Sequence, residues 1–212
     1  MNNKQAIIFD LDGTITNTFD LAVQGSKDAI KEVSGIAYSS EEITKYFGKT
    51  EEAVFKQYCG DKWQQGVDCY AKYFEERTDR GVVFPGMIEI FDYLKANGIK
   101  MALVTGRGPV TTEIILRRTD IRKYFDYVKT GSVLESIKTK CMQEVLAAWG
   151  QNPRDTYYIG DIPHDAKDSL AAGVNPLGAN WYKNATREEL LAAGAVKVFS
   201  TVEEFSAWVK EN

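Results

Sequence analysis

Residues 6–14, AIIFDLDGT, constrain the fold of this chain more than any other stretch. Four apolar residues run directly into two aspartates that are separated by one residue, and a Gly-Thr pair follows. An apolar run that ends in turn residues is typical of a buried strand in a parallel sheet. Carboxylates at the carboxyl end of such a strand lie where open α/β sheets bind their ligands. Because like charges held this close need a cation or a shared proton, we interpret Asp10 and Asp12 as half of a metal site.

The rest of the chain alternates between apolar runs and helical periodicity. Segments between these runs carry apolar residues at helical spacing and end at glycines, as amphipathic helices do. Strands that alternate with helices predict an α/β fold with a doubly wound parallel sheet. The expected strands are 6–9, 100–105, 127–129, 156–159, 176–180 and 196–199.

One long segment, 16–84, carries helical patterns and no strand signal. Ser39 and Glu42 have the spacing of a capping box, which marks the start of one of its helices. We interpret the segment as an all-helical subdomain inserted into the α/β unit, because about seventy residues are too many for a loop. The expected domains are therefore an α/β core of residues 1–15 and 85–212 and a helical cap of residues 16–84.

Composition excludes some partners and favours one compartment. The chain has 212 residues and a net charge of −4, which argues against nucleic acid or an anionic membrane as partner. Three cysteines, an odd number, indicate a reducing environment without a disulfide framework. No signal-peptide pattern or membrane-spanning apolar run occurs, so we expect a cytoplasmic protein. Whether it is a monomer or a homodimer stays open.

Chemistry-bearing residues recur at the ends of later predicted strands. Thr105 ends the second strand, Lys138 opens the helix before the fourth, and GDxxxD places Asp161 and Asp165 after the fourth. This set, together with DLDGT, resembles the haloacid dehalogenase superfamily. The order and spacing are similar to its phosphatase branch with an α-helical cap, which includes the phosphoglycolate phosphatases.

The resemblance implies a Mg²⁺-dependent phosphatase that acts on a small phosphorylated metabolite. Asp10 would be the nucleophile, forming an aspartyl phosphate, and Asp12 the general acid and base. Asp10, the backbone carbonyl of Asp12, and Asp161 would hold Mg²⁺, with Asp165 supporting these ligands rather than binding directly. The groups expected to bind the phosphate are Thr105, the Gly106 backbone N–H and Lys138.

Several residues keep an alternative interpretation. Lys140 lies close to Lys138, and either lysine could be only a solvated charge at a helix start. Thr105 could instead be the N-cap of the next helix. Lys49, in a turn of the cap, is a candidate for binding an anionic or hydroxylated substrate end, or an exposed lysine between two helices. His164, the single histidine, is interpreted as a surface residue.

Two other functions compete with a phosphatase. A sugar phosphomutase of the β-phosphoglucomutase type would keep all of these residues and would retain its intermediate for a second transfer. A non-catalytic binding protein on the same fold would be expected to lose one of the acidic residues, and none is lost here. A dehalogenase proper needs neither Asp12 nor Asp161.

Overall fold

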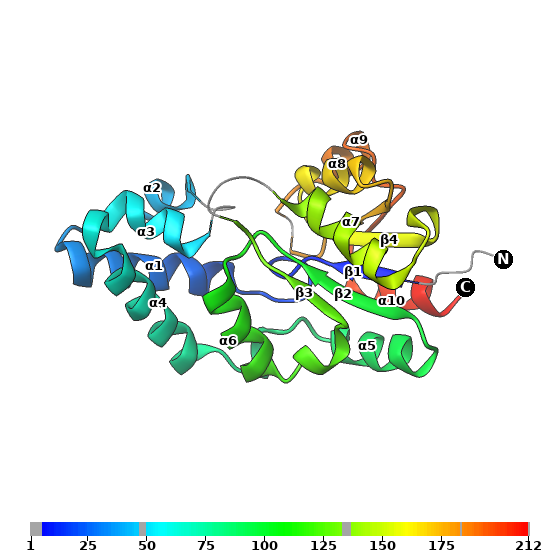
Figure 1. Ribbon diagram of the computed structural model, residues 1–212, viewed down its shortest axis with the longest axis horizontal. Helices are drawn as coiled ribbons and strands as arrows, with labels where there is room; N and C mark the ends of the chain where they lie inside the picture. The colour runs from blue at the N-terminus through cyan, green and yellow to red at the C-terminus, as the bar shows by residue number, and fades with distance from the viewer. Residues whose placement is uncertain (1–5, 47–49, 133–136, 183, 212) are drawn as a thin grey trace.

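We describe the protein from a computed structural model, in which residues 6–46, 50–132, 137–182 and 184–211 are described. A six-stranded sheet lies at one end of the molecule, and a group of helices forms the other end of the molecule (Figure 1). Within the described part of the chain, no helix is both long and apolar enough to cross a bilayer.

The sheet is entirely parallel, with strand order β3-β2-β1-β4-β5-β6. β1 lies between the second and fourth strands and is buried at all four positions, as its uninterrupted apolar sequence predicts. The predicted doubly wound α/β fold is therefore confirmed. The strands are β1 (Ala6–Phe9), β2 (Lys100–Val104), β3 (Tyr127–Lys129), β4 (Thr156–Gly160), β5 (Asn175–Ala179) and β6 (Lys197–Phe199).

Helices cover both faces of the sheet (Figure 1). On one face, α5 (Met87–Ala96) and α10 (Val202–Lys210) pack with Phe9 in the larger apolar core. On the other face, Ile8 packs with α7 (Lys138–Trp149), and α8 (Pro163–Ala171) lies beside it. The alternation of Ile8 and Phe9 between two cores follows from the two-residue period of a strand. α6 (Pro109–Thr119) and α9 (Arg187–Ala192) complete the helices of this part.

The described helices between residues 19 and 77 form the group at the left of Figure 1. It consists of α1 (Phe19–Ser34), α2 (Ser40–Thr44), α3 (Glu51–Cys59) and α4 (Trp63–Arg77), with α1 packed on α3 and α4. The capping box of Ser39 and Glu42 forms at the start of α2, as predicted. Two chain segments join this group to the sheet, and they are hydrogen-bonded to each other through Asn17 N to Val82 O at 2.7 Å. We call these helices the cap and the remainder the core, although their independence as domains stays a prediction.

Four of the strands differ from the predicted ranges by one residue at one end or both. β2 ends at Val104, so Thr105 lies just beyond the strand. α8 begins at Pro163, because proline is well suited to the first helical position. α9 was not expected, since its six residues are too few to give a periodic signal.

Candidate active site

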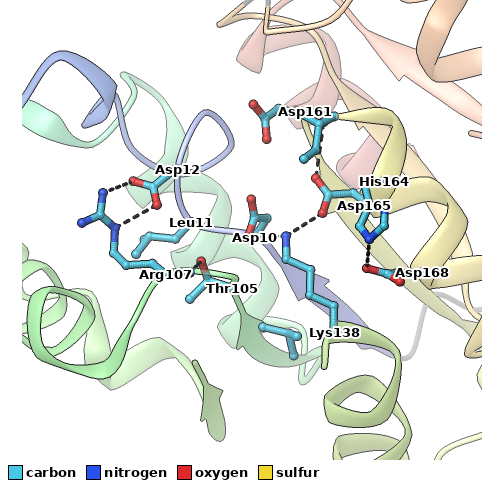
Figure 2. A network of polar contacts seen from close by, with 12 residues as sticks. Asp10, Leu11, Asp12, Thr105, Arg107, Lys138, Asp161, His164, Asp165 and Asp168 are labelled. Atoms are coloured by element: carbon cyan, nitrogen blue, oxygen red, sulfur yellow. Dashed lines mark hydrogen bonds and ion pairs between the residues drawn. The ribbon is translucent and has the colours of Figure 1, made fainter. Parts of the chain in front are cut away.

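Three of the candidate residues follow directly on neighbouring strands. Asp10 follows β1, Thr105 follows β2 and Asp161 follows β4. Because β2 and β4 both pair with β1 in parallel register, the three strands end at the same edge of the sheet. The side chains that follow them line one cavity of about 220 Å³ and are drawn together in Figure 2.

Lys138 binds two of the carboxylates in this cavity. Its Nζ lies 3.0 Å from Oδ1 of Asp10 and 2.6 Å from Oδ1 of Asp165. Burial acts to lower the pKa of Lys138, but the two negative charges raise it well above its ordinary value, so the ammonium group stays charged. Lys140 is exposed, because residues two positions apart on a helix face different directions. The structure therefore brings Lys138, and not Lys140, to Asp10.

Three buried carboxylates lie together beside this lysine. One oxygen each of Asp10, Asp161 and Asp165 lies within 4.8 Å of the other two. Burial, opposed by Lys138 and assisted by the charges of Asp165 and Asp12, raises the pKa of Asp10 to about 7. The pKa of Asp161 is raised well above its usual range by burial and by Asp10 and Asp165. A hard divalent cation such as Mg²⁺ relieves this repulsion and prefers carboxylate oxygens, so these residues fit such an ion.

Asp161 is oriented by two residues from distant parts of the chain. Asn184 Nδ2 donates a hydrogen bond to its Oδ2 at 2.5 Å. Gly13 has a φ of 74°, and a Cβ at that position would lie 2.2 Å from the same oxygen. The glycine of DLDGT is therefore needed both for its left-handed backbone and for the close approach of Asp161.

Asp165 has less free coordinating capacity than Asp161. Its Oδ1 accepts the hydrogen bond from Lys138, and its Oδ2 accepts one from the backbone N–H of Ile162 at 3.3 Å. Asp165 thus caps the start of α8 as well as pairing with the lysine. The assignment of Asp165 to a supporting position beside the metal stays a prediction.

Asp12 turns away from the carboxylate cluster and pairs with Arg107 (Figure 2). The guanidinium donates from Nε to Oδ2 and from Nη2 to Oδ1, each at 2.8 Å, and the Thr18 hydroxyl also donates to Asp12. Burial acts to raise the pKa of Asp12, but the charge and hydrogen bonds of Arg107 lower it overall. The side chain is therefore ionised here. The metal contact expected of Asp12 is made by its backbone carbonyl oxygen, and it stays a prediction.

Arg107 was not among the predicted site residues, yet it connects the core with the cap. Its Nη1 donates to the Thr111 hydroxyl at 2.8 Å, and its guanidinium lies 4.9 Å from the ring centre of Phe74 in α4. Thr111 in turn donates its backbone N–H to Glu51 at the start of α3, at 3.2 Å. A charged residue in the loop directly after β2 was the signal that could have identified it.

The remaining candidates are placed as follows. Thr105 is not the N-cap of α6, because Gly108 occupies that position, and its hydroxyl accepts a hydrogen bond from Arg107 N at 3.1 Å. Gly106 lines the cavity next to it. His164 is on α8 with a side chain that is 61% exposed, in agreement with a surface residue. Lys49 lies outside the described residues.

The cap contributes much of the cavity wall. The cap residues that line the cavity are Phe19, Ala22 and Ser26 of α1, Glu51, Val54 and Phe55 of α3, and Tyr70 of α4. These residues follow ordinary helical periodicity, so nothing in the sequence distinguished them from residues that pack in the core.

Comparison with known families agrees with this geometry. The family profile described as "Haloacid dehalogenase-like hydrolase" matches residues 7–179, which is most of the chain. The chain belongs to this family. The resemblance inferred from DLDGT and GDxxxD is thereby confirmed, and the protein is an enzyme, a hydrolase of the phosphatase type.

Individual relatives of this hydrolase carry several names. It is 30% identical over 181 residues to a Clostridium perfringens protein named "Putative pyrophosphatase PpaX", covering 84% of each chain. A solved structure described as "a predicted phosphoglycolate phosphatase" from Haemophilus somnus superposes with a TM-score of 0.79 at 21% identity, covering 100% of this chain and 99% of that one. Another, a "putative beta-phosphoglucomutase" from Thermotoga maritima, has a TM-score of 0.76 at 23% identity, with 98% and 99% covered. At these identities, the two structures show a shared fold.

Proposed function

We propose that this hydrolase is a Mg²⁺-dependent phosphatase that releases phosphate from a small phosphate monoester through an aspartyl phosphate on Asp10. One observation carries the proposal: the buried cluster of Asp10, Asp161 and Asp165, with Lys138 beside it, lies at the end of the central strand and lines a cavity. A nucleophile, a site for a cation and a fixed positive charge are what transfer of a phosphoryl group requires.

The donor set supports Mg²⁺ as the cofactor. Asp10 and Asp161 offer carboxylate oxygens, and a bound cation would offset the burial and the mutual repulsion that raise the pKa of both groups. Once bound, Mg²⁺ would neutralise charge on the phosphoryl oxygens and on the attacking carboxylate. Asp165 and Asn184 would keep the neighbouring groups in position.

Asp10 is proposed to attack phosphorus with the oxygen that is not paired to Lys138. A bond forms between this oxygen and phosphorus while the bond to the ester oxygen breaks, which leaves an aspartyl phosphate and an alcohol. The Thr105 hydroxyl and the Gly106 backbone N–H would bind phosphoryl oxygens, and Lys138 would offset the added negative charge. Water then attacks phosphorus, releasing phosphate and restoring the Asp10 carboxylate.

Asp12 is proposed to move the protons in both steps. It would donate a proton to the leaving ester oxygen and then take one from the attacking water. Ionised and paired with Arg107, it is in the protonation state that the second step needs. The first step needs a protonated Asp12 that faces the ester oxygen, so the Asp12–Arg107 pair must open during the cycle.

The cap is proposed to exclude water while these steps occur. The linkers expected to act as hinges, residues 16–19 and 80–86, include the two segments that are hydrogen-bonded through Asn17 and Val82. Lys49 remains a candidate for binding the far end of the substrate. The enzyme is proposed to be cytoplasmic and to act on a small phosphorylated metabolite rather than on nucleic acid or a membrane.

Phosphate release by the Asp10→Asn variant tests the mechanism. The amide cannot form the aspartyl phosphate, so we expect kcat to fall by at least about a thousandfold while circular dichroism stays unchanged. Chelation of the metal should likewise abolish turnover, and added Mg²⁺ should restore it. Phosphate release by a folded Asp10→Asn protein at the wild-type rate would contradict the nucleophile assignment.

A phosphomutase and a pyrophosphatase are the alternatives that the relatives' names raise. They differ from a monoester phosphatase in their products. An isomerised sugar phosphate without net phosphate release would indicate a mutase, and two phosphates per pyrophosphate would indicate a pyrophosphatase. A panel of phosphoglycolate, sugar phosphates, nucleotides and pyrophosphate, with and without Mg²⁺, separates these activities.

A further inference from the structure

We propose that the cap side of the active-site cavity binds a small, uncharged alcohol group of the substrate, with Ser26 as the residue that recognises a hydroxyl on it. The proposal rests on the proposed phosphatase function and deepens it, because it assigns the class of ester. A site for an uncharged alcohol would exclude a second phosphate or a carboxylate-bearing group as the preferred leaving group.

One face of α1 forms an apolar wall of the cavity. Phe19, Ala22 and Ser26 are spaced three and four residues apart, which puts them on the same side of the helix, and all three line the cavity. Ala22 is 4% exposed and Ser26 is 3% exposed, so both are packed firmly within this wall. An apolar wall favours a carbon skeleton over a charged group.

The neighbouring cap helices continue this wall. Val54 and Phe55 of α3 and Tyr70 of α4 line the same cavity, and each is at most 5% exposed. Phe55 and Tyr70 contact each other with ring centres 5.4 Å apart, which fixes the shape of this side. The cavity volume of about 220 Å³ is below the usual range for drug-sized ligands, which favours a small leaving group on this side.

The charges of the cavity oppose a second anionic group. Among the described lining residues, the carboxylates of Asp10, Asp12, Glu51 and Asp161 face two cations, Arg107 and Lys138. Both cations are already paired, Lys138 with Asp10 and Arg107 with Asp12. The substrate phosphate and one divalent ion would balance each other, so a further negative charge would lie near four carboxylates with no free cation among the described lining residues.

Ser26 supplies a polar group within the apolar wall. The residue is 3% exposed overall, and it lines the cavity. Its hydroxyl has no hydrogen-bond partner among the described residues, yet it is not one of the polar atoms that are sealed from solvent, so water in the cavity can reach it. A hydroxyl of the bound ester would take the place of that water as the partner of the Ser26 hydroxyl.

A matched pair of esters tests the charge preference in the full-length enzyme with Mg²⁺. Phosphoglycolate and 2-hydroxyethyl phosphate differ in one group, a carboxylate in the first and a hydroxymethyl group in the second. We expect kcat/KM for 2-hydroxyethyl phosphate to exceed that for phosphoglycolate and for pyrophosphate by about tenfold or more. An equal or higher kcat/KM for either anionic substrate overturns the inference and leaves the phosphatase intact, whereas no phosphate release from any ester overturns the proposed function itself.

Ser26→Ala tests the hydroxyl recognition against a control on the same helix. We expect this variant to lower the ratio of kcat/KM for 2-hydroxyethyl phosphate to that for ethyl phosphate by roughly three- to tenfold. Ser34→Ala is the control, since the Ser34 hydroxyl donates to Ile30 O outside the cavity, and the ratio should not change. An unchanged ratio in a folded Ser26→Ala protein would show that Ser26 has only a packing role.

Discussion

At the scale of single residues, Arg107 controls the state of the proposed acid and base. Its guanidinium holds Asp12 through two hydrogen bonds of 2.8 Å, and it is only 8% exposed. A partly buried bidentate pair of this kind both orients the carboxylate and keeps it ionised. Asp12, the proposed acid and base, is therefore connected to the cap through one side chain that is not itself proposed to contact the phosphate.

Replacing Arg107 separates its effect on the pKa of Asp12 from its effect on the position of the Asp12 carboxylate. In Arg107→Gln, the charge that lowers the pKa of Asp12 is lost, so the acidic limb of the pH profile of kcat/KM should move to higher pH. Activity near neutral pH should fall roughly tenfold, because Asp12 is no longer held in place. Arg107→Lys keeps the positive charge and should move the acidic limb less. If the two variants give the same acidic limb as the wild type, Arg107 does not set the protonation of Asp12.

At the scale of elements, α3 and α6 are joined across the cap and the core by Glu51. This residue is 7% exposed and accepts hydrogen bonds from both the backbone N–H and the hydroxyl of Thr111. A Cβ on Gly108 would lie 1.3 Å from Glu51 Oε2, so the glycine permits this close approach. The contact holds the two elements together around the cavity, and we expect it to favour the closed arrangement of the cap.

Glu51→Gln weakens this contact without changing its size. We expect KM to rise roughly three- to tenfold, because the charged hydrogen bonds to Thr111 are replaced by neutral ones. Glu52→Gln is the matched control, since Glu52 is the next residue and pairs with Lys56 on the exposed side of α3. Steady-state kinetics on the best ester would measure both variants, and an equal rise in the control would mean that the contact does not control closure.

At the scale of the whole molecule, the carboxylate cluster links stability to pH and to metal. The pKa of Asp10 is raised from 3.8 to about 7, chiefly by burial. Folding raises the pKa of this carboxyl group. Such a group contributes stability to the folded state below the pKa that it has in the unfolded state, and this stability is lost as the pH rises through the pKa that it has in the folded state. The metal-free enzyme should therefore lose stability between about pH 4 and pH 7.

Thermal unfolding of the wild type and of Asp10→Asn measures this linkage. At about pH 7.5 without metal, the Asn variant should be more stable by about 2–4 kcal/mol, because it carries no buried charge, and the difference should shrink towards pH 5. Lys138 keeps Asp165 as a partner in the variant. Mg²⁺ should stabilise the wild type more than the variant. Parallel pH profiles of the two metal-free proteins would contradict the raised pKa of Asp10.

Most of the fold was predictable because its signals are local. The apolar run before Asp10, the glycines that end the helices and the capping box at Ser39 each act within a few residues. Thr105 and Asp161 could be assigned to one edge of the sheet, since parallel strands that alternate with helices end on the same side. α9 was missed because it is too short to give a periodic pattern.

By itself, then, the sequence determined the α/β class, the family and the set of acidic residues, because these follow from short motifs. Only the tertiary structure decided which groups meet. Arg107 pairs with Asp12 from 95 positions away, and Asn184 reaches Asp161 from the loop after β5. Lys138 rather than Lys140 contacts Asp10 because the packing of α7 turns only one of them inward. Such ion pairs depend on how distant elements pack, and no local spacing encodes that arrangement.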